Sequence, residues 1–346
     1  MISRVLMLVG PERVELREVP VPSPRAGELL LSVDAATTCG TDLKVFLRGG
    51  HPRMLRVPTP FGHEVAGTVA AVDAGVSRWR EGDQVVVANS ASCGTCRACT
   101  AGRENLCADL EYLNGTFADH LRVPERFVRR STYPRPPGIE AAAAALAEPL
   151  ACVLHGLSTL GSREPSTALV LGAGPIGLMF VTELMRLGHE VTIADVEPAR
   201  LAAGRQAGAR DAVRVLREDG DRELPRAALV VEATGRGDGW RAALRAVEVG
   251  GEVLLFGGCP PGSEVPLDAH RLHYSELVVR GAYHHRPVTF EAALARLSEP
   301  GCPHHRLIEA RYPLEDVETA LREMAARRIL KAAIVPSLPL EARSKA

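Results

Sequence analysis

The sequence lacks an excess of charge of either sign. Its 346 residues include 41 Lys and Arg against 42 Asp and Glu, which gives a formal net charge of -1, and no long block of one sign occurs. A protein that binds nucleic acid through the phosphate backbone needs a basic face. We therefore expect no nucleic-acid partner.

The sequence also lacks a long hydrophobic run and an export signal. The apolar stretch at residues 168–185 contains three glycines, a proline and a glutamate, whereas a membrane span needs roughly 20 predominantly apolar residues. Residues 1–16 include a short apolar run but no small-residue cleavage site. These absences predict a cytoplasmic protein without a membrane partner.

Two hydrophobic patterns divide the chain, and at about 150 residues per domain its length predicts two domains. Residues 13–123 contain short apolar or alternating runs separated by Pro and Gly, which is typical of a small barrel or sandwich. Between residues 168 and 281, short apolar strands alternate with helical patterns, which predicts a parallel sheet. The Ala- and Leu-rich residues 139–160 connect the two regions, and the strand-like residues 331–337 are expected to rejoin the first.

A glycine motif opens the second region. Gly172, Gly174 and Gly177 form G-x-G-x-x-G between a predicted strand and a predicted helix, and Pro175 and Ile176 complete the loop. The first glycine permits a tight turn, the second lets the backbone approach a pyrophosphate, and the third lets the helix pack on the strand. The helix N-terminus then faces the phosphate charge. A dinucleotide site is therefore expected here, and a glycine-rich turn without a nucleotide is the alternative.

The next strand ends at Asp195, eighteen residues after Gly177. A carboxylate at this position can accept hydrogen bonds from the ribose hydroxyls and would repel a 2′-phosphate, which predicts NAD rather than NADP. Arg200 follows five residues later. It either lines the adenine or is a solvated helix residue, and we favour the second.

Four of the eight cysteines fall within fifteen residues at the spacing C-x2-C-x2-C-x7-C: Cys93, Cys96, Cys99 and Cys107. A secreted protein of this size would instead distribute cysteine pairs along its length. Four thiolates form a closed tetrahedral zinc site with no position open for substrate, which indicates a structural zinc. A zinc module that binds nucleic acid is the alternative, but this loop lacks a basic helix.

A third constellation is spread along the chain. Cys39 and Asp42 follow a predicted strand, His63 and Glu64 follow a Pro-rich loop, and Glu148 lies in the connecting segment. One thiolate, one imidazole and carboxylates suffice for a catalytic zinc with an open position. Each residue alone is ordinary, but together they favour a second metal site.

In this order, the motifs C-G-T-D, G-H-E, the four-cysteine loop, E-P-L and G-A-G-P-I-G resemble those of the zinc-dependent medium-chain alcohol dehydrogenases. The closest resemblance is to their polyol (sorbitol) and threonine dehydrogenase branch. The resemblance implies an α/β protein in which a doubly wound Rossmann NAD-binding domain is inserted into a GroES-like, β-rich catalytic domain. The expected domains are 1–145 with the zinc loop 90–108, then 146–283 for the Rossmann domain, and 284–346 for the remainder of the catalytic domain.

The resemblance also implies a role for each residue of the third constellation. Cys39, His63 and Glu64 are expected to ligate the catalytic zinc, with Glu148 beside it as a ligand or through a bound water. Asp42 is expected to hydrogen-bond the second ring nitrogen of His63 and so to fix its tautomer. Thr41 is expected to take the proton of the substrate hydroxyl.

The sequence departs from the family pattern in two places. Lys44 stands where this branch commonly has the histidine that completes a proton relay, so the amine either relays protons or anchors the cofactor. His284 and His285 replace an Arg-Tyr pair that holds a sugar-like chain. We expect both histidines to line the substrate pocket, together with Phe46 and His51.

These observations predict a dehydrogenase with two zinc ions per chain that interconverts a secondary alcohol, polyol-like or otherwise hydroxylated, and its ketone with NAD. The family is usually dimeric or tetrameric, so a homodimer or homotetramer is expected. An NADP-dependent sugar or amino-alcohol dehydrogenase is one alternative, and a non-catalytic protein that senses NAD is another. A zinc-free NADPH reductase of enones or quinones would lack the thiolate loop and the C-G-T-D and G-H-E motifs.

Overall fold

The chain passes twice between two folded units in the computed structural model, which describes residues 2–51, 53–161, 164–215, 224–339 and 344–345. The first unit comprises residues 1–151 and 286–346, and the second comprises residues 152–285. The boundaries therefore fall after residues 151 and 285, rather than after residues 145 and 283 as expected. The first boundary differs because helix α5 (Ala147–Ser158) begins in the first unit and ends in the second.

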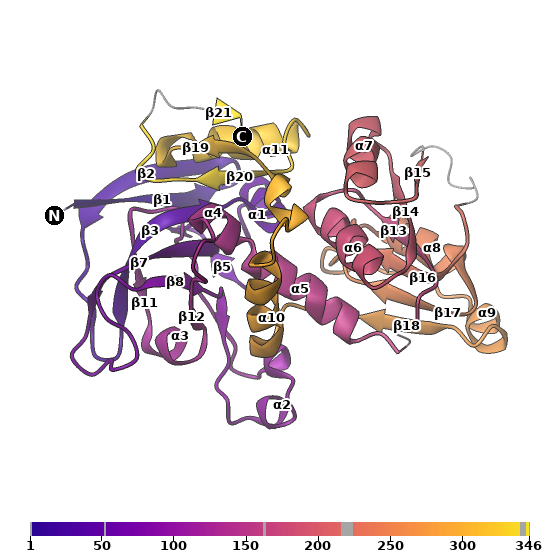
Figure 1. Ribbon diagram of the computed structural model, residues 1–346, viewed down its shortest axis with the longest axis horizontal. Coiled ribbons are helices and arrows are strands. Elements are labelled where there is room, and N and C mark those ends of the chain that lie inside the picture. Colours follow the sequence, from indigo (N-terminus) through magenta and orange to yellow (C-terminus); the bar gives the residue numbers. More distant parts are fainter. Residues whose placement is uncertain (1, 52, 162–163, 216–223, 340–343, 346) are drawn as a thin grey trace. The chain divides into compact units, whose positions relative to one another are not determined.

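The first unit is built mainly from β-strands (Figure 1). One sheet has the order β2-β1-β6, and an eight-stranded sheet has the order β12-β8-β7-β3-β20-β19-β21, with β11 paired to β3. The strands of the two sheets are β1 (Ile2–Gly10), β2 (Arg13–Pro20), β3 (Leu29–Thr37), β6 (Thr59–Pro60), β7 (Glu64–Val72), β8 (Gln84–Val87), β11 (His120–Val123), β12 (Thr132–Pro134), β19 (Ile308–Tyr312), β20 (Lys331–Ile334) and β21 (Ser344–Lys345).

Short hairpins and helices complete this unit. The hairpins pair β4 (Gly50–His51) with β5 (Leu55–Arg56) and β9 (Ser90–Ala91) with β10 (Glu111–Tyr112). The α-helices besides α5 are α1 (Gly40–Arg48), α2 (Arg97–Thr100), α3 (Glu125–Arg130), α4 (Ala141–Ala145), α10 (Pro287–Leu297) and α11 (Val317–Ala325). The 3-10 turns are η1 (Glu104–Leu106), η2 (Pro303–Leu307) and η3 (Leu314–Asp316).

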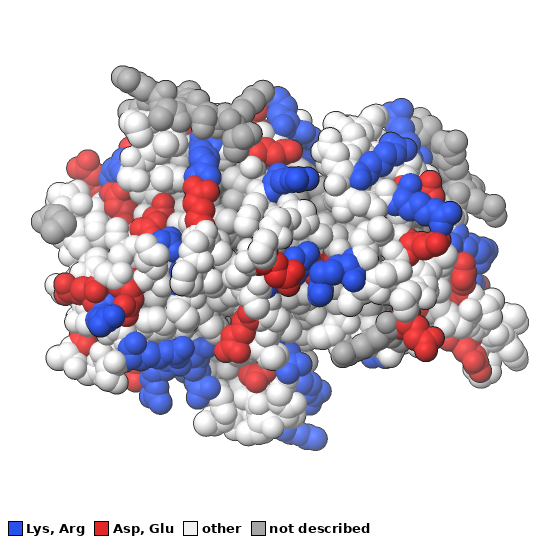
Figure 2. Space-filling view, viewed as in Figure 1, with Lys and Arg blue, Asp and Glu red and all other residues white. Residues whose placement is uncertain are grey.

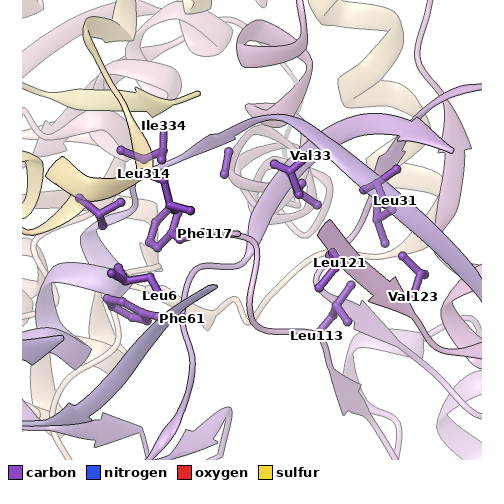
Figure 3. Close-up of a cluster of buried hydrophobic side chains, with 14 of the residues drawn as sticks. Leu6, Leu31, Val33, Phe61, Leu113, Phe117, Leu121, Val123, Leu314 and Ile334 are labelled. Atoms are coloured by element: carbon purple, nitrogen blue, oxygen red, sulfur yellow. The ribbon is translucent and has the colours of Figure 1, made fainter. Parts of the chain in front are cut away.

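The hydrophobic core of the first unit joins both ends of the chain (Figure 3). Phe61 and Phe117 meet edge to face, with ring centroids 5.6 Å apart and an interplanar angle of 87°, a geometry that aromatic pairs prefer. Leu314 and Ile334, from the last segment, are buried in the same cluster. Strand β20 also pairs with β3, so the C-terminal segment does rejoin the first part of the chain, as expected.

The second unit is a parallel six-stranded sheet of order β15-β14-β13-β16-β17-β18. In this doubly wound order, successive strands are added outward from β13 on one side and outward from β16 on the other, while all strands stay parallel. The expected Rossmann fold is therefore confirmed. The strands are β13 (Thr167–Leu171), β14 (Glu190–Asp195), β15 (Asp211–Arg214), β16 (Ala227–Glu232), β17 (Val247–Leu255) and β18 (Val278–Gly281). The helices are α6 (Pro175–Arg186), α7 (Pro198–Gln206), α8 (Gly237–Ala246) and α9 (Ala269–Tyr274) (Figure 1).

Two observations on this fold concern the expected absence of a membrane span and of a nucleic-acid partner. Within the described residues, the helical stretch Ala141–Ser158 is long and apolar enough to cross a membrane, but 83% of it is buried inside the protein, as in the core helix of a globular domain. On the face that Figure 2 shows, basic and acidic side chains lie interspersed, and the basic ones gather only into small groups.

Candidate metal and dinucleotide sites

Cys39 occupies the N-cap of helix α1. Its Sγ accepts a hydrogen bond from the backbone N–H of Thr41 at 3.5 Å, and the Asp42 carboxylate accepts one from the N–H of Cys39 at 2.9 Å. The motif C-G-T-D is therefore a capping box in which the thiol replaces the usual hydroxyl. This capping arrangement fixes the position of the Cys39 sulfur at the start of the helix.

His63 reaches the same place through a glycine turn. Gly62 has φ 90°, and a Cβ there would lie 2.5 Å from the hydroxyl of Thr116, so only glycine fits before the histidine. The Nδ1 of His63 lies 2.8 Å from Asp42 Oδ1, the hydrogen bond that the resemblance implied. Burial disfavours the imidazolium, but the neighbouring Asp42 carboxylate raises the pKa of His63 well above its ordinary value. Because Asp42 contacts Nδ1, Nε2 is the ring nitrogen that could ligate a metal.

Glu64 is the first residue of β7 and is 0% exposed. Both of its carboxylate oxygens contact Lys331 Nζ, at 3.0 and 2.8 Å, and the Thr37 hydroxyl also donates to the carboxylate. Lys331 is 1% exposed. Burial disfavours its charge, but Glu64 and the other acidic groups nearby raise the pKa of Lys331. No local motif marks this lysine in the sequence; the only signal is that it is one of three lysines in the chain.

The donor atoms of Cys39, His63 and Glu64 all lie within 4.8 Å of one another. A thiolate, an imidazole and a carboxylate at these separations suit a zinc ion with a fourth position open. Glu148 lies outside this set. Its Oε1 accepts a hydrogen bond from Asn89 Nδ2 at 3.0 Å, and burial raises the pKa of Glu148 to about 7.

The other residues that we expect near the substrate lie in different environments. Lys44 is exposed on α1. Phe46 is 1% exposed and belongs to the hydrophobic core. It faces inward because α1 buries one stripe of its surface against α11.

His51 accepts hydrogen bonds at Nδ1 from the N–H groups of residues 53 and 54. His284 and His285 lie in the second unit, with ring centroids 4.2 Å apart.

The four clustered cysteines lie together around α2 and η1. Their sulfur atoms are separated by 3.5 Å (Cys93 and Cys107), 3.6 Å (Cys96 and Cys99), 3.9 Å (Cys96 and Cys107) and 4.0 Å (Cys93 and Cys99). Four sulfurs that surround zinc at about 2.3 Å in a tetrahedron would be about 3.8 Å apart. These separations therefore fit a zinc site and are far too long for disulfides.

Backbone N–H groups donate to the sulfur atoms of this loop. The N–H groups of Thr95 and Cys96 lower the pKa of Cys93 to about 6. The thiol of Cys107 accepts hydrogen bonds from the N–H groups of Cys93 and Asp109, each at 3.3 Å, but burial outweighs these donors and raises the pKa of Cys107 to about 12. The loop thus orients several donors toward the sulfur atoms, as a thiolate metal site requires.

The glycine motif lies between β13 and α6. Gly172 has φ 100°, and a Cβ on Gly177 would overlap the carbonyl oxygen of Gly172, so the turn and the close helix packing both need glycine. Gly174 is the N-cap of α6 and has open space where its Cβ would be, which leaves room for a phosphate. Pro175, the first residue of α6, has the backbone angle that a helix start needs.

Asp195 ends β14 beside this motif. Its Oδ2 accepts a hydrogen bond from the N–H of Ala173 at 2.7 Å and its Oδ1 accepts one from the N–H of Glu197 at 2.9 Å. Each carboxylate oxygen has a further lone pair for a ribose hydroxyl. Arg200 is half-buried on α7.

Comparisons with known proteins identify the family of each part of the chain. Residues 25–134 match the alcohol dehydrogenase GroES-like domain, and residues 175–299 match the zinc-binding dehydrogenase domain. The chain is 35% identical to a D-altritol 5-dehydrogenase of Agrobacterium fabrum, over 90% of this chain and 93% of that protein. It is 31% identical to a sorbitol dehydrogenase of Bombyx mori, over 94% and 97%. A Sinorhizobium meliloti structure described as a zinc-binding dehydrogenase bound to NADP has a TM-score of 0.87 at 26% identity, covering 97% of this chain and 100% of that one.

Proposed function

The chain belongs to the zinc-dependent medium-chain alcohol dehydrogenases, in their polyol and threonine dehydrogenase branch, and from this premise we propose that it interconverts a polyol-like secondary alcohol and its ketone with NAD. The observation that carries the proposal is the converging donor set of half-buried Cys39 and buried His63 and Glu64, in a chain that also has a complete dinucleotide fingerprint ending at Asp195. We propose Glu64 as the third zinc ligand, with Glu148 beside it.

The bound groups would supply Lewis-acid polarisation of the alcohol oxygen, by zinc, and acceptance of the hydride, by NAD. The chain's own residues would hold the metal ligands and move the proton. Asp42 keeps the ring of His63 in one tautomer through the 2.8 Å contact at Nδ1. The hydroxyl of Thr41 would accept the proton of the substrate alcohol. Lys44, three residues later on the same side of α1, would pass it to solvent.

The proposal also covers the zinc content, the oligomeric state and the location of the protein. We propose two zinc ions per chain, one in the catalytic set and one held by the four-cysteine loop. Strand β18 is an edge of its sheet among the described residues, and its unpaired backbone groups suit pairing with a second copy in a homodimer or homotetramer. All eight cysteines are free of disulfides in the structure, in keeping with a cytoplasmic location.

The experiment that tests the reaction is a substrate panel. Purified zinc-loaded protein would be incubated with NAD and polyols, inositols, amino alcohols or simple secondary alcohols, and NADH formation would be followed by absorbance. We expect turnover with at least one polyol and its loss in a His63→Ala variant that still binds NADH. NADH binding without turnover of any alcohol would favour a non-catalytic NAD-sensing protein.

Asp195 is expected to set the cofactor preference. The relative bound to NADP makes NADP the second candidate cofactor. A carboxylate next to a 2′-phosphate costs several kcal/mol, which predicts that kcat/KM for NAD exceeds that for NADP by about 10²-fold or more. Asp195→Ser should reduce this preference to about tenfold or less.

Asp211→Ser is the matched control, since this carboxylate is exposed on β15, opposite Thr192 rather than Asp195. It should leave the preference unchanged. A wild-type protein that uses NADP better than NAD would contradict the role of Asp195.

Lys44 is expected to relay the proton. If its neutral amine accepts the proton, alcohol oxidation rises with pH, and Lys44→His moves this rise to lower pH, because imidazole titrates near pH 6.5. Lys44→Met should lose turnover at neutral pH while its affinity for NAD stays nearly unchanged. The measurement is the pH profile of kcat together with the dissociation constant of NADH. Arg48→Met, one turn later on the same helix, is the control. An unchanged pH profile with weaker NADH binding in both Lys44 variants would show that Lys44 only anchors the cofactor.

A further inference from the structure

One buried carboxylate of the second unit, that of Glu232, belongs to neither the metal sites nor the glycine motif. Glu232 is the last residue of β16 and is 0% exposed. Its Oε1 accepts hydrogen bonds from the N–H of Thr234, at 2.7 Å, and from the Thr234 hydroxyl, and its Oε2 accepts one from the N–H of Gly235 at 3.2 Å. These contacts fold the loop that follows β16 back onto the carboxylate.

The fold leaves a fitted space for this side chain. A Cβ on Gly239 would lie 2.6 Å from Glu232 Oε1, and a Cβ on Gly257 would lie 2.7 Å from Glu232 Oε2. Gly239 lies on α8 and Gly257 follows β17. The backbone carbonyl of Glu232 also accepts hydrogen bonds from the N–H groups of residues 256 and 257, at 3.0 and 2.9 Å. Glu232 therefore ties together the loops that follow β16 and β17.

The first of these loops touches the dinucleotide fingerprint. Glu232 pairs with Leu171 across β16 and β13, and the N–H of Ala233 donates to the carbonyl of Leu171 at 2.9 Å. A Cβ on Gly172 would lie 3.0 Å from the Thr234 methyl carbon. The direction in which successive strands are added to the sheet reverses between β13 and β16. In doubly wound folds a dinucleotide binds across the crevice at that point. Asp195 belongs to the half of the sheet before the reversal, and Glu232 belongs to the half after it.

We propose that Glu232 is a positioning residue for the nicotinamide half of the dinucleotide. It holds the loops at residues 233–236 and 256–258 in the shape that this half binds, while the Asp195 side of the crevice binds the adenosine half. The inference rests on the proposed dinucleotide-dependent function, and it adds a separate residue for each half of the cofactor.

The test compares two ligands in binding measurements that need no turnover. Isothermal titration of NADH and of AMP, with the zinc-loaded protein, reports the whole dinucleotide and its adenosine half. In Glu232→Gln the amide nitrogen must face one of the loop N–H donors, so one buried hydrogen bond is lost. We expect the affinity for NADH to fall about tenfold or more while the affinity for AMP stays within about twofold. Asp195→Ser should give the opposite pattern, with weaker AMP binding.

A milder pair of variants guards against misfolding of Glu232→Gln. Thr234→Val removes the hydroxyl that donates to the carboxylate, whereas Thr234→Ser keeps it. We expect weaker NADH binding with unchanged AMP binding in the first, and wild-type affinities in the second. Equal losses for AMP and NADH, or a lower melting temperature with unchanged NADH affinity, would overturn the inference and leave Glu232 a structural residue. A wild-type protein that binds neither NADH nor NADPH would instead overturn the proposed function itself.

Discussion

In protein whose Cys39, His63 and Glu64 set carries no zinc, replacing Lys331 with methionine is expected to lower the free energy of unfolding of the first unit by about 3–5 kcal/mol, because the variant then leaves a buried carboxylate without a counter-charge. Lys331 Nζ contacts both oxygens of Glu64, and both side chains are almost completely buried. The Thr37 hydroxyl, which also donates to Glu64, carries no charge to replace the lost ammonium.

The two tryptophans of the chain make this measurement specific. Trp79 is buried in the core of the first unit, and Trp240 lies in the second. Urea unfolding followed by the fluorescence of Trp79, in a Trp240→Phe background, therefore reports the first unit alone. Lys331→Arg, which keeps the charge, should be much less destabilised. Adding Glu64→Gln to Lys331→Met should recover stability, because the cost comes from the unpaired charge. A loss below about 1 kcal/mol in the single variant would contradict a dry, buried pair.

Replacing Cys93 with serine is expected to remove one of two zinc ions and to unfold the loop at residues 90–108. Structural zinc sites contribute about 10–16 kcal/mol of apparent binding free energy, and this loop has a mainly polar sequence with little core of its own. Cys93 is the thiol whose pKa the backbone donors lower to about 6, so it contributes a thiolate at neutral pH.

Elemental analysis should give about two zinc ions per chain in the wild type and about one in Cys93→Ser, and limited proteolysis should cut the variant within the loop. Cys259→Ser, which replaces a cysteine of the second unit outside the cluster, is the control and should keep both ions. If Cys93→Ser retained the full zinc content and the protease resistance of the wild type, the loop would not be a metal site.

The sequence alone determined those features whose parts lie close together along the chain. The cysteine spacing indicated a four-thiolate loop, and the sulfur separations agree with it. The glycine motif between a strand and a helix indicated the Rossmann turn, and Gly172 and Gly177 occupy positions that only glycine fits. Local hydrogen bonds and sterics link residues within a few positions of one another, so spacing is sufficient to recognise them.

Only the tertiary structure decided which distant residues meet. Lys331 reaches Glu64 because β20 pairs with β3, which pairs with β7, a register that joins positions 267 residues apart. Phe46 lies on the buried rather than the exposed side of α1 because of its packing against α11, which a helical pattern alone does not specify. The cradle around Glu232 likewise needs Gly239 and Gly257 from separate elements. Such contacts depend on strand register and helix packing, which the whole hydrophobic core determines, and no local spacing encodes them.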